Sequence, residues 1–222
     1  MQFFVDSDDI EAIVELFELG IVDGVTTNPL VFARSGRDPR KAIAEICELV
    51  KTSVSIEVIA SQYNAMLNEA QSWLDMGFGS QITIKLPITM EGLRACKTLI
   101  SRGIMVNMTL CFSPTQAMLA AKAGATYVSI FMGRLDDIGH NGIELVRTVC
   151  DMFNHYPEIN TQVLAASIRH QGHIIGAAKA GADVITASPH ILRSLVTHPL
   201  TAKGVIEFEQ AGIAYVQSKN KK

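Results

Sequence analysis

The sequence predicts an α/β protein, a single (β/α)8 barrel of the TIM type that spans residues 1–222 and carries one extra C-terminal helix. Short apolar, β-branched segments alternate with longer amphipathic ones along the whole chain, and such alternation indicates a parallel sheet because parallel strands need crossover connections. Eight of these units follow one another with no strand left over, which favours a closed barrel over the alternative, an open doubly wound sheet. No linker or shift in composition divides the chain, so we expect one domain.

Each expected strand is a run of apolar and β-branched residues bounded by turn or polar residues. In chain order the expected strands are Phe3–Asp6, Gly24–Thr27, Ser53–Val58, Gln81–Leu86, Met105–Leu110, Tyr127–Met132, Gln162–Ser167 and Asp183–Ala187. A helical pattern follows each of them and supplies the crossover to the next strand.

The ends of several helices are marked by residue type. Ser113-Pro114 and Ser188-Pro189 each place an N-cap hydroxyl before a proline at the first helical position. The sequence Ala-Lys-Ala-Gly-Ala occurs at 121–125 and again at 178–182. In both copies a helix is expected to end at a glycine that can adopt the left-handed conformation before the next strand. The Gly77-Phe78-Gly79 stretch reads as another helix-to-strand turn.

Residues 199–217 predict one further helix beyond the eighth unit. Its apolar side chains need cover, and we expect them at a subunit contact; they are Val205, Ile206, Phe208, Ile213 and Val216. Residues 218–222 are expected to form a frayed basic tail.

Composition excludes several classes of protein. Hydrophobic residues make up 48% and charged residues 18% of the chain, which indicates a large core and not disorder. A net charge of −3 argues against nucleic acid and acidic membrane as partners, since both require a basic face. We expect no signal peptide, because acidic Asp6 follows the N-terminus closely, and no apolar run reaches the length of a membrane span.

The cysteines indicate a reducing compartment. Cys47, Cys96, Cys111 and Cys150 are scattered and form no C-x-x-C pair. In a chain able to build a full core, such thiols are expected to be buried and reduced, which predicts a cytoplasmic protein.

In a barrel of this type the active site lies at the C-terminal ends of the strands. Polar residues within or just after otherwise apolar strands are informative there, because a buried polar group costs free energy unless it has a partner. Together with one phenylalanine, the candidate site residues are Asp6, Thr26, Asn28, Glu57, Lys85, Asn107, Thr109, Ser129, Phe131, Arg134, Ser167 and Arg169.

Lys85 is the sharpest of these signals, because it interrupts the apolar run Ile82–Pro87. Desolvation favours the neutral amine, which can attack a carbonyl. The alternative is a lysine that reaches out to solvent or pairs with a core carboxylate. Asp6 or Glu57 could supply that carboxylate. Pairing with one lysine would account for only one of the two acids, so we expect both to transfer protons near Lys85.

Arg134 and Arg169 follow the sixth and seventh strands and suit a phosphate group, which arginine can grip in a bidentate way. The alternative is that both arginines form ion pairs on the protein surface. His170 and His173 have a spacing found in helical metal sites, but no third ligand stands nearby. Asp136-Asp137 is expected to be a solvated loop and not a magnesium site. We therefore expect no metal.

Six segments together resemble one family. They are Thr26–Pro29, Ser55–Val58, Ile82–Pro87, Asn107–Leu110, Phe131–Arg134 and Ala166–Arg169. In this order they resemble the transaldolase family, most closely its small branch, which includes fructose-6-phosphate aldolase. The resemblance covers the chain from Asp6 to the eighth strand.

The resemblance implies a class I aldolase mechanism without metal or organic cofactor. The imine-forming lysine falls on Lys85, the catalytic carboxylates on Asp6 and Glu57, and the hydroxyl that helps hold a catalytic water on Thr109. Contacts to substrate hydroxyls fall on Thr26, Asn28 and Ser129, and contacts to phosphate on Arg134, Ser167 and Arg169; Asn107 and Phe131 complete the expected substrate-binding set. A homo-oligomer, pentamer or decamer, is implied as well.

The implied substrates are sugar phosphates, and the implied reaction converts sedoheptulose 7-phosphate and glyceraldehyde 3-phosphate to erythrose 4-phosphate and fructose 6-phosphate. The nearest alternative is an aldolase that releases free dihydroxyacetone, and that branch carries glutamine and tyrosine where this chain has Glu57 and Phe131. The sequence therefore favours the transferase. A barrel isomerase or decarboxylase of sugar phosphates, or a non-catalytic binding protein, would leave the embedded Lys85 unexplained.

Overall fold

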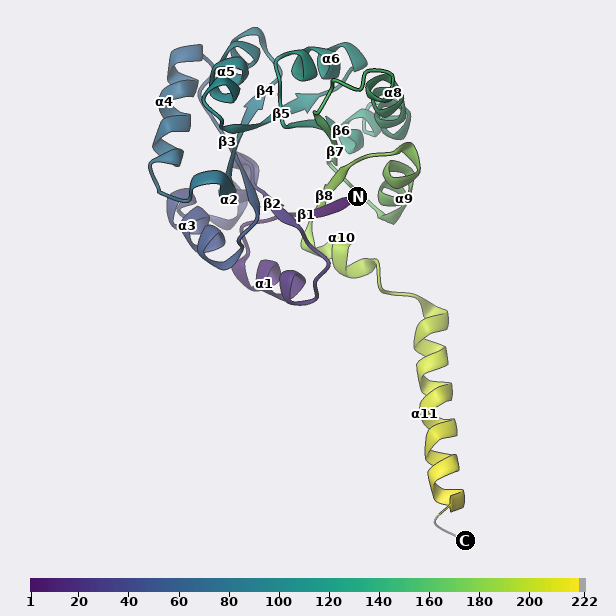
Figure 1. The fold of residues 1–222 in the computed structure, drawn as a ribbon. Coiled ribbons are helices and arrows are strands. Elements are labelled where there is room, and N and C mark those ends of the chain that lie inside the picture. The colour runs from purple at the N-terminus through teal and green to yellow at the C-terminus, as the bar shows by residue number, and fades with distance from the viewer. Residues whose placement is uncertain (220–222) are drawn as a thin grey trace.

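In the computed structural model, which describes residues 1–219, eight parallel strands close into a barrel in the order β1 to β8 (Figure 1). The strands are β1 Gln2–Asp6, β2 Gly24–Thr26, β3 Ser53–Glu57, β4 Ile82–Pro87, β5 Met105–Cys111, β6 Tyr127–Phe131, β7 Gln162–Ala166 and β8 Val184–Ala187. Every end lies within one residue of the predicted end. The predicted barrel is confirmed.

All the helices except α11 surround the barrel (Figure 1). The helices are α1 Ile10–Glu18, α2 Pro29–Ser35, α3 Pro39–Leu49, α4 Tyr63–Leu74, α5 Met90–Ser101, α6 Pro114–Lys122, α7 Met132–Asp136, α8 Gly142–Asn154, α9 Gln171–Ala180, α10 Pro189–Ser194 and α11 Pro199–Lys219, with a 3-10 turn η1 at Gly79–Gln81. Strands β2 and β6 are each followed by two helices where the sequence predicted one helical pattern, and β8 is followed by α10 and by the predicted further helix α11. The short helices α2, α7 and α10 therefore begin next to the C-terminal ends of these strands.

The cap predictions hold with one exception. The Ser113 hydroxyl accepts a hydrogen bond from the Gln116 backbone N–H, and Gly124 and Gly181 have left-handed φ angles of 85° and 90°. Ser188 has the extended backbone of an N-cap, but its side chain makes no cap hydrogen bond.

The barrel interior is apolar at one end and polar at the other. Successive side chains of a strand point to opposite faces, so the interior positions alternate along each strand. Phe4, Tyr127, Leu164 and Val184 form a buried cluster, in which the Phe4 and Tyr127 rings meet edge to face with centroids 5.9 Å apart. Two residues further along β1, β6 and β8 stand Asp6, Ser129 and Thr186. The apolar cluster thus closes the barrel beneath a polar chamber.

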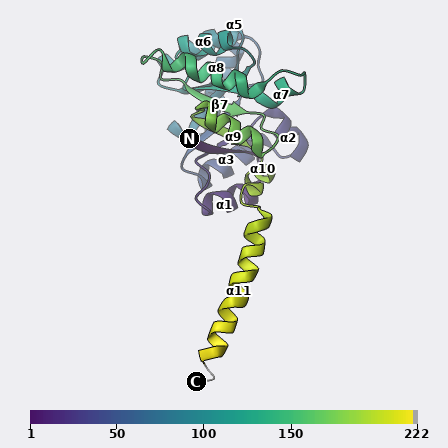
Figure 2. The ribbon, with the colours of Figure 1, turned by 90° about the vertical axis from the view of Figure 1, so that its right-hand side faces the viewer.

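Helix α11 extends away from the barrel (Figures 1 and 2), and its large apolar side chains are exposed, for example Phe208 at 80% and Leu200 at 70%. It runs to Lys219, two residues beyond the predicted end, and residues 220–222 of the expected tail lie outside the described residues. Within residues 1–219 no helix combines the length and apolarity that a membrane crossing needs.

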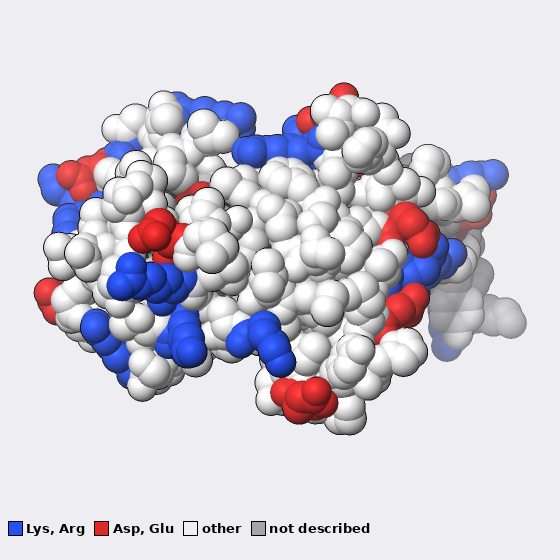
Figure 3. All heavy atoms as spheres, turned by 90° about the horizontal axis from the view of Figure 1, so that it is seen from above, with Lys and Arg blue, Asp and Glu red and all other residues white. Residues whose placement is uncertain are grey.

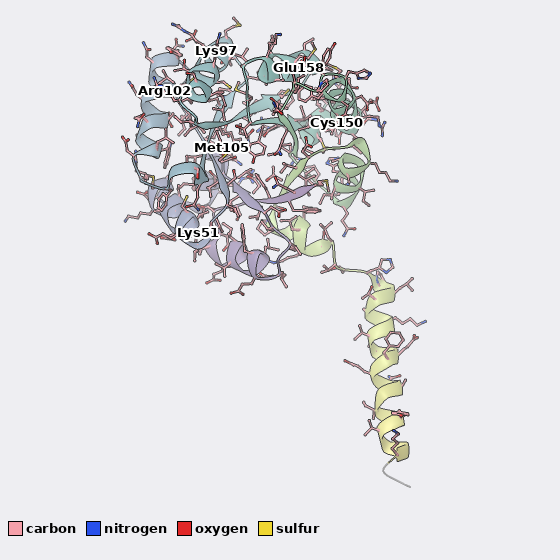
Figure 4. The ribbon with its side chains drawn as sticks, viewed as in Figure 1. Lys51, Lys97, Arg102, Met105, Cys150 and Glu158 are labelled. Carbon is pink, nitrogen blue, oxygen red and sulfur yellow. The ribbon has the colours of Figure 1, made fainter. Side chains whose placement is uncertain are left out.

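Charge is mixed on the face of the molecule shown in Figure 3. On the face seen from above, Lys and Arg alternate with Asp and Glu among broad uncharged areas, so the described residues of that face form no continuous basic band (Figure 3). The helix-to-strand connections, which carry Lys51, Arg102 and Glu158, lie around the rim of the barrel (Figure 4). These connections lie at the N-terminal ends of the strands, opposite the candidate site.

Candidate active site

A cavity of about 470 Å³ opens at the C-terminal ends of the strands. All the predicted site residues except Asn107 and Thr109 line it; the list is Asp6, Thr26, Asn28, Glu57, Lys85, Ser129, Phe131, Arg134, Ser167 and Arg169. The short helix α2 adds Leu30, Val31 and Arg34 to one wall. The predicted residues thus gather around one cavity, at the end of the barrel where sites of this fold lie.

Lys85 stays inside the barrel. Its side chain is 6% exposed, and its Nζ lies 2.9 Å from Oε2 of Glu57 and donates a hydrogen bond of 3.2 Å to the Thr27 carbonyl. The pairing of β3 with β4 sets Glu57 beside Lys85 in the sheet. Of the two acids, Glu57 is therefore the one that pairs with the amine.

Asp6 is held by neutral donors. Its Oδ1 accepts hydrogen bonds from the Thr26 hydroxyl at 3.1 Å and from the Asn28 amide at 3.2 Å. Burial raises the pKa of the Asp6 carboxyl, an effect that the charge of Lys85 and the two hydrogen bonds oppose. A carboxyl of this kind can take up and return a proton nearer to neutral pH than an exposed aspartate.

Asn28 links this acid to helix α2. Its Oδ1 accepts hydrogen bonds from the backbone N–H groups of Leu30 and Val31 as the N-cap of α2, while its amide donates to Asp6. On the other side, the Thr26 hydroxyl lies 2.6 Å from the Thr186 hydroxyl. Because Thr26 donates to Asp6, Thr186 must donate to Thr26, so the donor direction along this chain is fixed.

Asn107 and Thr109 are fully buried and do not line the cavity. Asn107 accepts a 2.7 Å hydrogen bond from the Ser129 hydroxyl and donates to Ser55 at 3.3 Å. Asn107 thus contacts Ser129, which does line the cavity. The buried Thr109 hydroxyl has no hydrogen-bond partner among the described residues, which leaves it able to bind a small polar molecule.

The two arginines lie at the cavity mouth. The Arg134 guanidinium stands 5.0 Å from the centre of the Phe131 ring, and Arg169 donates to Asp137 at 2.9 Å. Ser167 and Leu110, which also line the cavity, have left-handed φ angles of 59° and 58°. Such backbone strain in residues other than glycine persists only where the surrounding structure holds it, and it is concentrated at functional sites.

The family model for Transaldolase/Fructose-6-phosphate aldolase matches residues 3–221. The chain belongs to this family. Proteins named "Probable transaldolase" from Brucella ovis and Paracoccus denitrificans are 52% and 50% identical to it, each over 208 residues and 94% of both chains. One from Ruegeria sp. is 50% identical over the same share. The resemblance found in the sequence is confirmed, and the chain is an enzyme of the transaldolase/aldolase family.

Thr186 and Arg34 also line the cavity of this transaldolase-family protein, but they were not predicted from the sequence. Thr186 stands in the apolar run Val184–Ala187, so the signal that selected Thr26 and Lys85 was present there too. Arg34 lies on a helical pattern and gives no such signal.

The Asp136-Asp137 pair is exposed as predicted but does not form a loop. The two residues end helix α7, where Asp136 contacts His173 and Asp137 contacts Arg169. Within residues 1–219 no cluster of three or more His, Cys, Asp and Glu side chains is placed to hold a metal ion.

Proposed function

We propose that this chain is a single-domain transaldolase that moves a dihydroxyacetone unit between ketose and aldose phosphates through an imine on Lys85. The reaction interconverts sedoheptulose 7-phosphate plus glyceraldehyde 3-phosphate with erythrose 4-phosphate plus fructose 6-phosphate, without metal or organic cofactor. One observation carries the proposal: a buried amine and two carboxyls, Lys85, Glu57 and Asp6, line the same cavity as the two arginines at its mouth. The names of the relatives agree with it.

Imine formation requires a neutral amine. The 2.9 Å contact lets the Lys85 ammonium pass a proton to Glu57, and the amine then attacks the C2 ketone of the substrate. Loss of water from the adduct needs a second proton transfer. We assign it to Glu57 acting through a water held by Thr109, whose buried hydroxyl has a free hydrogen-bonding capacity among the described residues.

The protonated imine is an electron sink, so the C3–C4 bond breaks once the C4 hydroxyl loses its proton. We assign that proton to Asp6, because burial raises its pKa and the residue lines the cavity. An aldehyde phosphate leaves, and an enamine remains on Lys85. A second aldose phosphate then adds to the enamine carbon, Asp6 returns the proton, and hydrolysis frees the new ketose.

The remaining contacts position the sugar. Arg134, Ser167 and Arg169 bind the phosphate at the mouth, since guanidinium groups form paired, charge-assisted hydrogen bonds with phosphate oxygens. Asn28, Thr26 and Ser129 face the sugar hydroxyls, and Asn107 acts indirectly by orienting Ser129.

Phe131 favours transferase over free aldolase activity. It lines the cavity, packs edge to face on Phe112 with ring centroids 5.8 Å apart, and has no hydroxyl to pass a proton to the enamine carbon. Glu57 accepts hydrogen bonds from the catalytic water but, when ionised, cannot donate as an amide would. The enamine should therefore persist until an acceptor aldehyde arrives.

The test is the release of glyceraldehyde 3-phosphate from fructose 6-phosphate with and without erythrose 4-phosphate. Release should be fast only with the acceptor, and Phe131→Tyr should raise acceptor-free cleavage. Equal rates for the unmodified protein with and without acceptor would establish the alternative, an aldolase that releases dihydroxyacetone.

We further propose a homo-oligomer, a pentamer or decamer, in which α11 covers a neighbouring subunit. The exposed apolar residues of α11 support this, since Val205, Ile206 and Phe208 are 50%, 54% and 80% exposed. Light scattering on a chain cut after His198 should report smaller particles than the intact chain. An intact chain that runs as a monomer contradicts the assembly.

A cytoplasmic location completes the proposal. Its support is that Cys47, Cys96, Cys111 and Cys150 are free and buried, as expected of a protein that folds in a reducing compartment. Burial also raises the pKa of the Cys96 and Cys150 thiols to about 12, so these side chains are protonated and unreactive at neutral pH.

A further inference from the structure

The loop that carries Ser167 and Arg169 is attached to helix α7 by two neighbouring acidic residues. Asp137 accepts a hydrogen bond of 2.9 Å from Nη2 of Arg169, and so holds the guanidinium directly. Asp136 does not touch Arg169; its Oδ2 lies 2.6 Å from Nε2 of His173 on α9. None of Asp136, Asp137 and His173 lines the cavity, so these residues can reach the substrate only through others.

His173 connects Asp136 to the backbone of the loop. Its side chain is 2% exposed, and its Nδ1 accepts a hydrogen bond of 3.3 Å from the backbone N–H of Arg169. Because Nδ1 accepts, the ring proton must lie on Nε2, where it points at Asp136. Burial lowers the pKa of His173, with a further contribution from His170, so the ring is neutral at neutral pH.

Asp136 is itself fixed at its second oxygen. Oδ1 accepts a hydrogen bond of 2.9 Å from the backbone N–H of Gly142, the first residue of α8. A continuous chain of hydrogen bonds therefore runs from α8 through Asp136 and His173 to the backbone of Arg169.

The loop also packs directly on α7. The Gly133 backbone N–H donates to the Ser167 carbonyl at 3.1 Å, and a Cβ at Gly133 would lie 2.2 Å from that carbonyl oxygen and 2.5 Å from Nε of Arg169. Only glycine allows this approach. Ser167 is held there with its left-handed φ of 59°, a conformation that needs support from its surroundings.

We infer that Asp136 and His173 are positioning residues for phosphate binding, which keep the Ser167–Arg169 loop against α7 and so aim Arg169 at the cavity. This inference rests on the proposed function, in which Arg169 binds the substrate phosphate. Residues that orient a binding group from behind decide how well it is preorganised, and their loss weakens binding without removing any contact to the ligand.

The test is Asp136→Asn, which keeps the size of the side chain. The asparagine side chain of this variant would have one oxygen, so it could not replace both carboxylate oxygens, which accept hydrogen bonds from Gly142 and His173. With that oxygen on Gly142, the side-chain NH2 group would face the Nε2–H of His173, and two donors cannot form a hydrogen bond. The readout is the phosphate preference, defined as kcat/KM for erythrose 4-phosphate divided by kcat/KM for erythrose, with fructose 6-phosphate as donor. In a ping-pong reaction these values report the acceptor half-reaction alone.

We expect Asp136→Asn to lower the phosphate preference about tenfold, the change that weakening one hydrogen bond to a charged group produces. A loss of folded protein lowers kcat/KM for both acceptors equally and leaves their ratio unchanged. A change in the ratio therefore reports an effect on phosphate binding and not a loss of stability. His173→Leu should act like Asp136→Asn. His173→Gln, which has both an acceptor and a donor, should restore part of the preference.

A double-mutant cycle shows whether Asp136 acts through Arg169. Arg169→Ala alone should lower the preference at least as much as Asp136→Asn, and the double variant should lower it no further than Arg169→Ala. An unchanged preference in Asp136→Asn, or an additive loss in the double variant, overturns the inference while leaving the proposed function intact. An unchanged preference in Arg169→Ala contradicts phosphate binding in the proposed function, and the inference with it.

Discussion

Replacing Lys85 by methionine tests the environment that the structure gives this side chain. The substitution keeps the length and most of the volume of the lysine, so no large cavity forms. It removes Nζ, which leaves the Glu57 carboxylate without its partner at 2.9 Å and the Thr27 carbonyl without its hydrogen bond. We expect the variant to be inactive and also less stable.

The magnitude follows from the burial of the pair. Breaking a buried ion pair by removing one partner costs about 3–5 kcal/mol. Glu57 is 15% exposed and keeps some contact with water, which favours about 3 kcal/mol, at the lower end of that range. The lost hydrogen bond to Thr27 adds about 1 kcal/mol. At about 2–4 °C per kcal/mol for a chain of this size, the Tm should fall by roughly 8–16 °C.

The assay is a thermal melt at one fixed protein concentration, because assembly makes Tm depend on concentration. The matched control is Lys85→Met combined with Glu57→Gln, which removes the unpaired charge and should recover most of the lost stability. A single variant that melts within about 2 °C of the parent, less than one kcal/mol, would refute the buried ion pair. A double variant no more stable than the single one would show that Glu57 is not the cause.

Three further predictions concern the other parts of the site. Asp6→Asn should abolish activity but raise the Tm at neutral pH. Burial raises the pKa of the Asp6 carboxyl in the folded state above its unfolded value of 3.8. The contribution of this carboxyl to folding stability is therefore complete below pH 3.8 and is lost as the pH rises through the pKa of the folded state. The advantage of the variant should therefore grow as the pH rises from about 3.8, and an advantage that shrinks would contradict this sign. Arg134→Ala should lower kcat/KM for erythrose 4-phosphate relative to erythrose by about 10–100-fold, the cost of 1.5–3 kcal/mol for a charged hydrogen bond; equal losses for both acceptors would indicate a structural role. Prolonged treatment with a strong chelator should leave the rate unchanged, and activity that zinc or magnesium restores after such treatment would refute the metal-independent mechanism.

The strands and the central site residues could be predicted because their signals are local. A strand buried on both faces reads as an apolar run, so a lysine or glutamate inside it, such as Lys85 or Glu57, stands out in the sequence. The rule that barrel sites lie at the C-terminal ends of strands then gathered residues that are far apart along the chain.

Other features could not be predicted because they depend on distant contacts or on elements too short to show a period. Helix α7 has five residues, which is barely more than one turn, so its amphipathic pattern cannot be read. The pairing of Asp136 with His173 arises only when α7 and α9 pack together. The buried position of Asn107 arises only when β5 comes together with β3 and β6, which carry its partners Ser55 and Ser129. The left-handed backbone of Ser167 has no signature in the sequence, since serine has no special preference for it.

Trapping the imine tests the central claim most directly. Incubation with fructose 6-phosphate followed by borohydride reduction should attach a reduced dihydroxyacetone fragment, and peptide mapping by mass spectrometry should locate it on the peptide that contains Lys85. Lys85→Met treated in the same way should carry no label. A fragment on another lysine, or an active enzyme that borohydride and substrate together leave unlabelled, would contradict the mechanism.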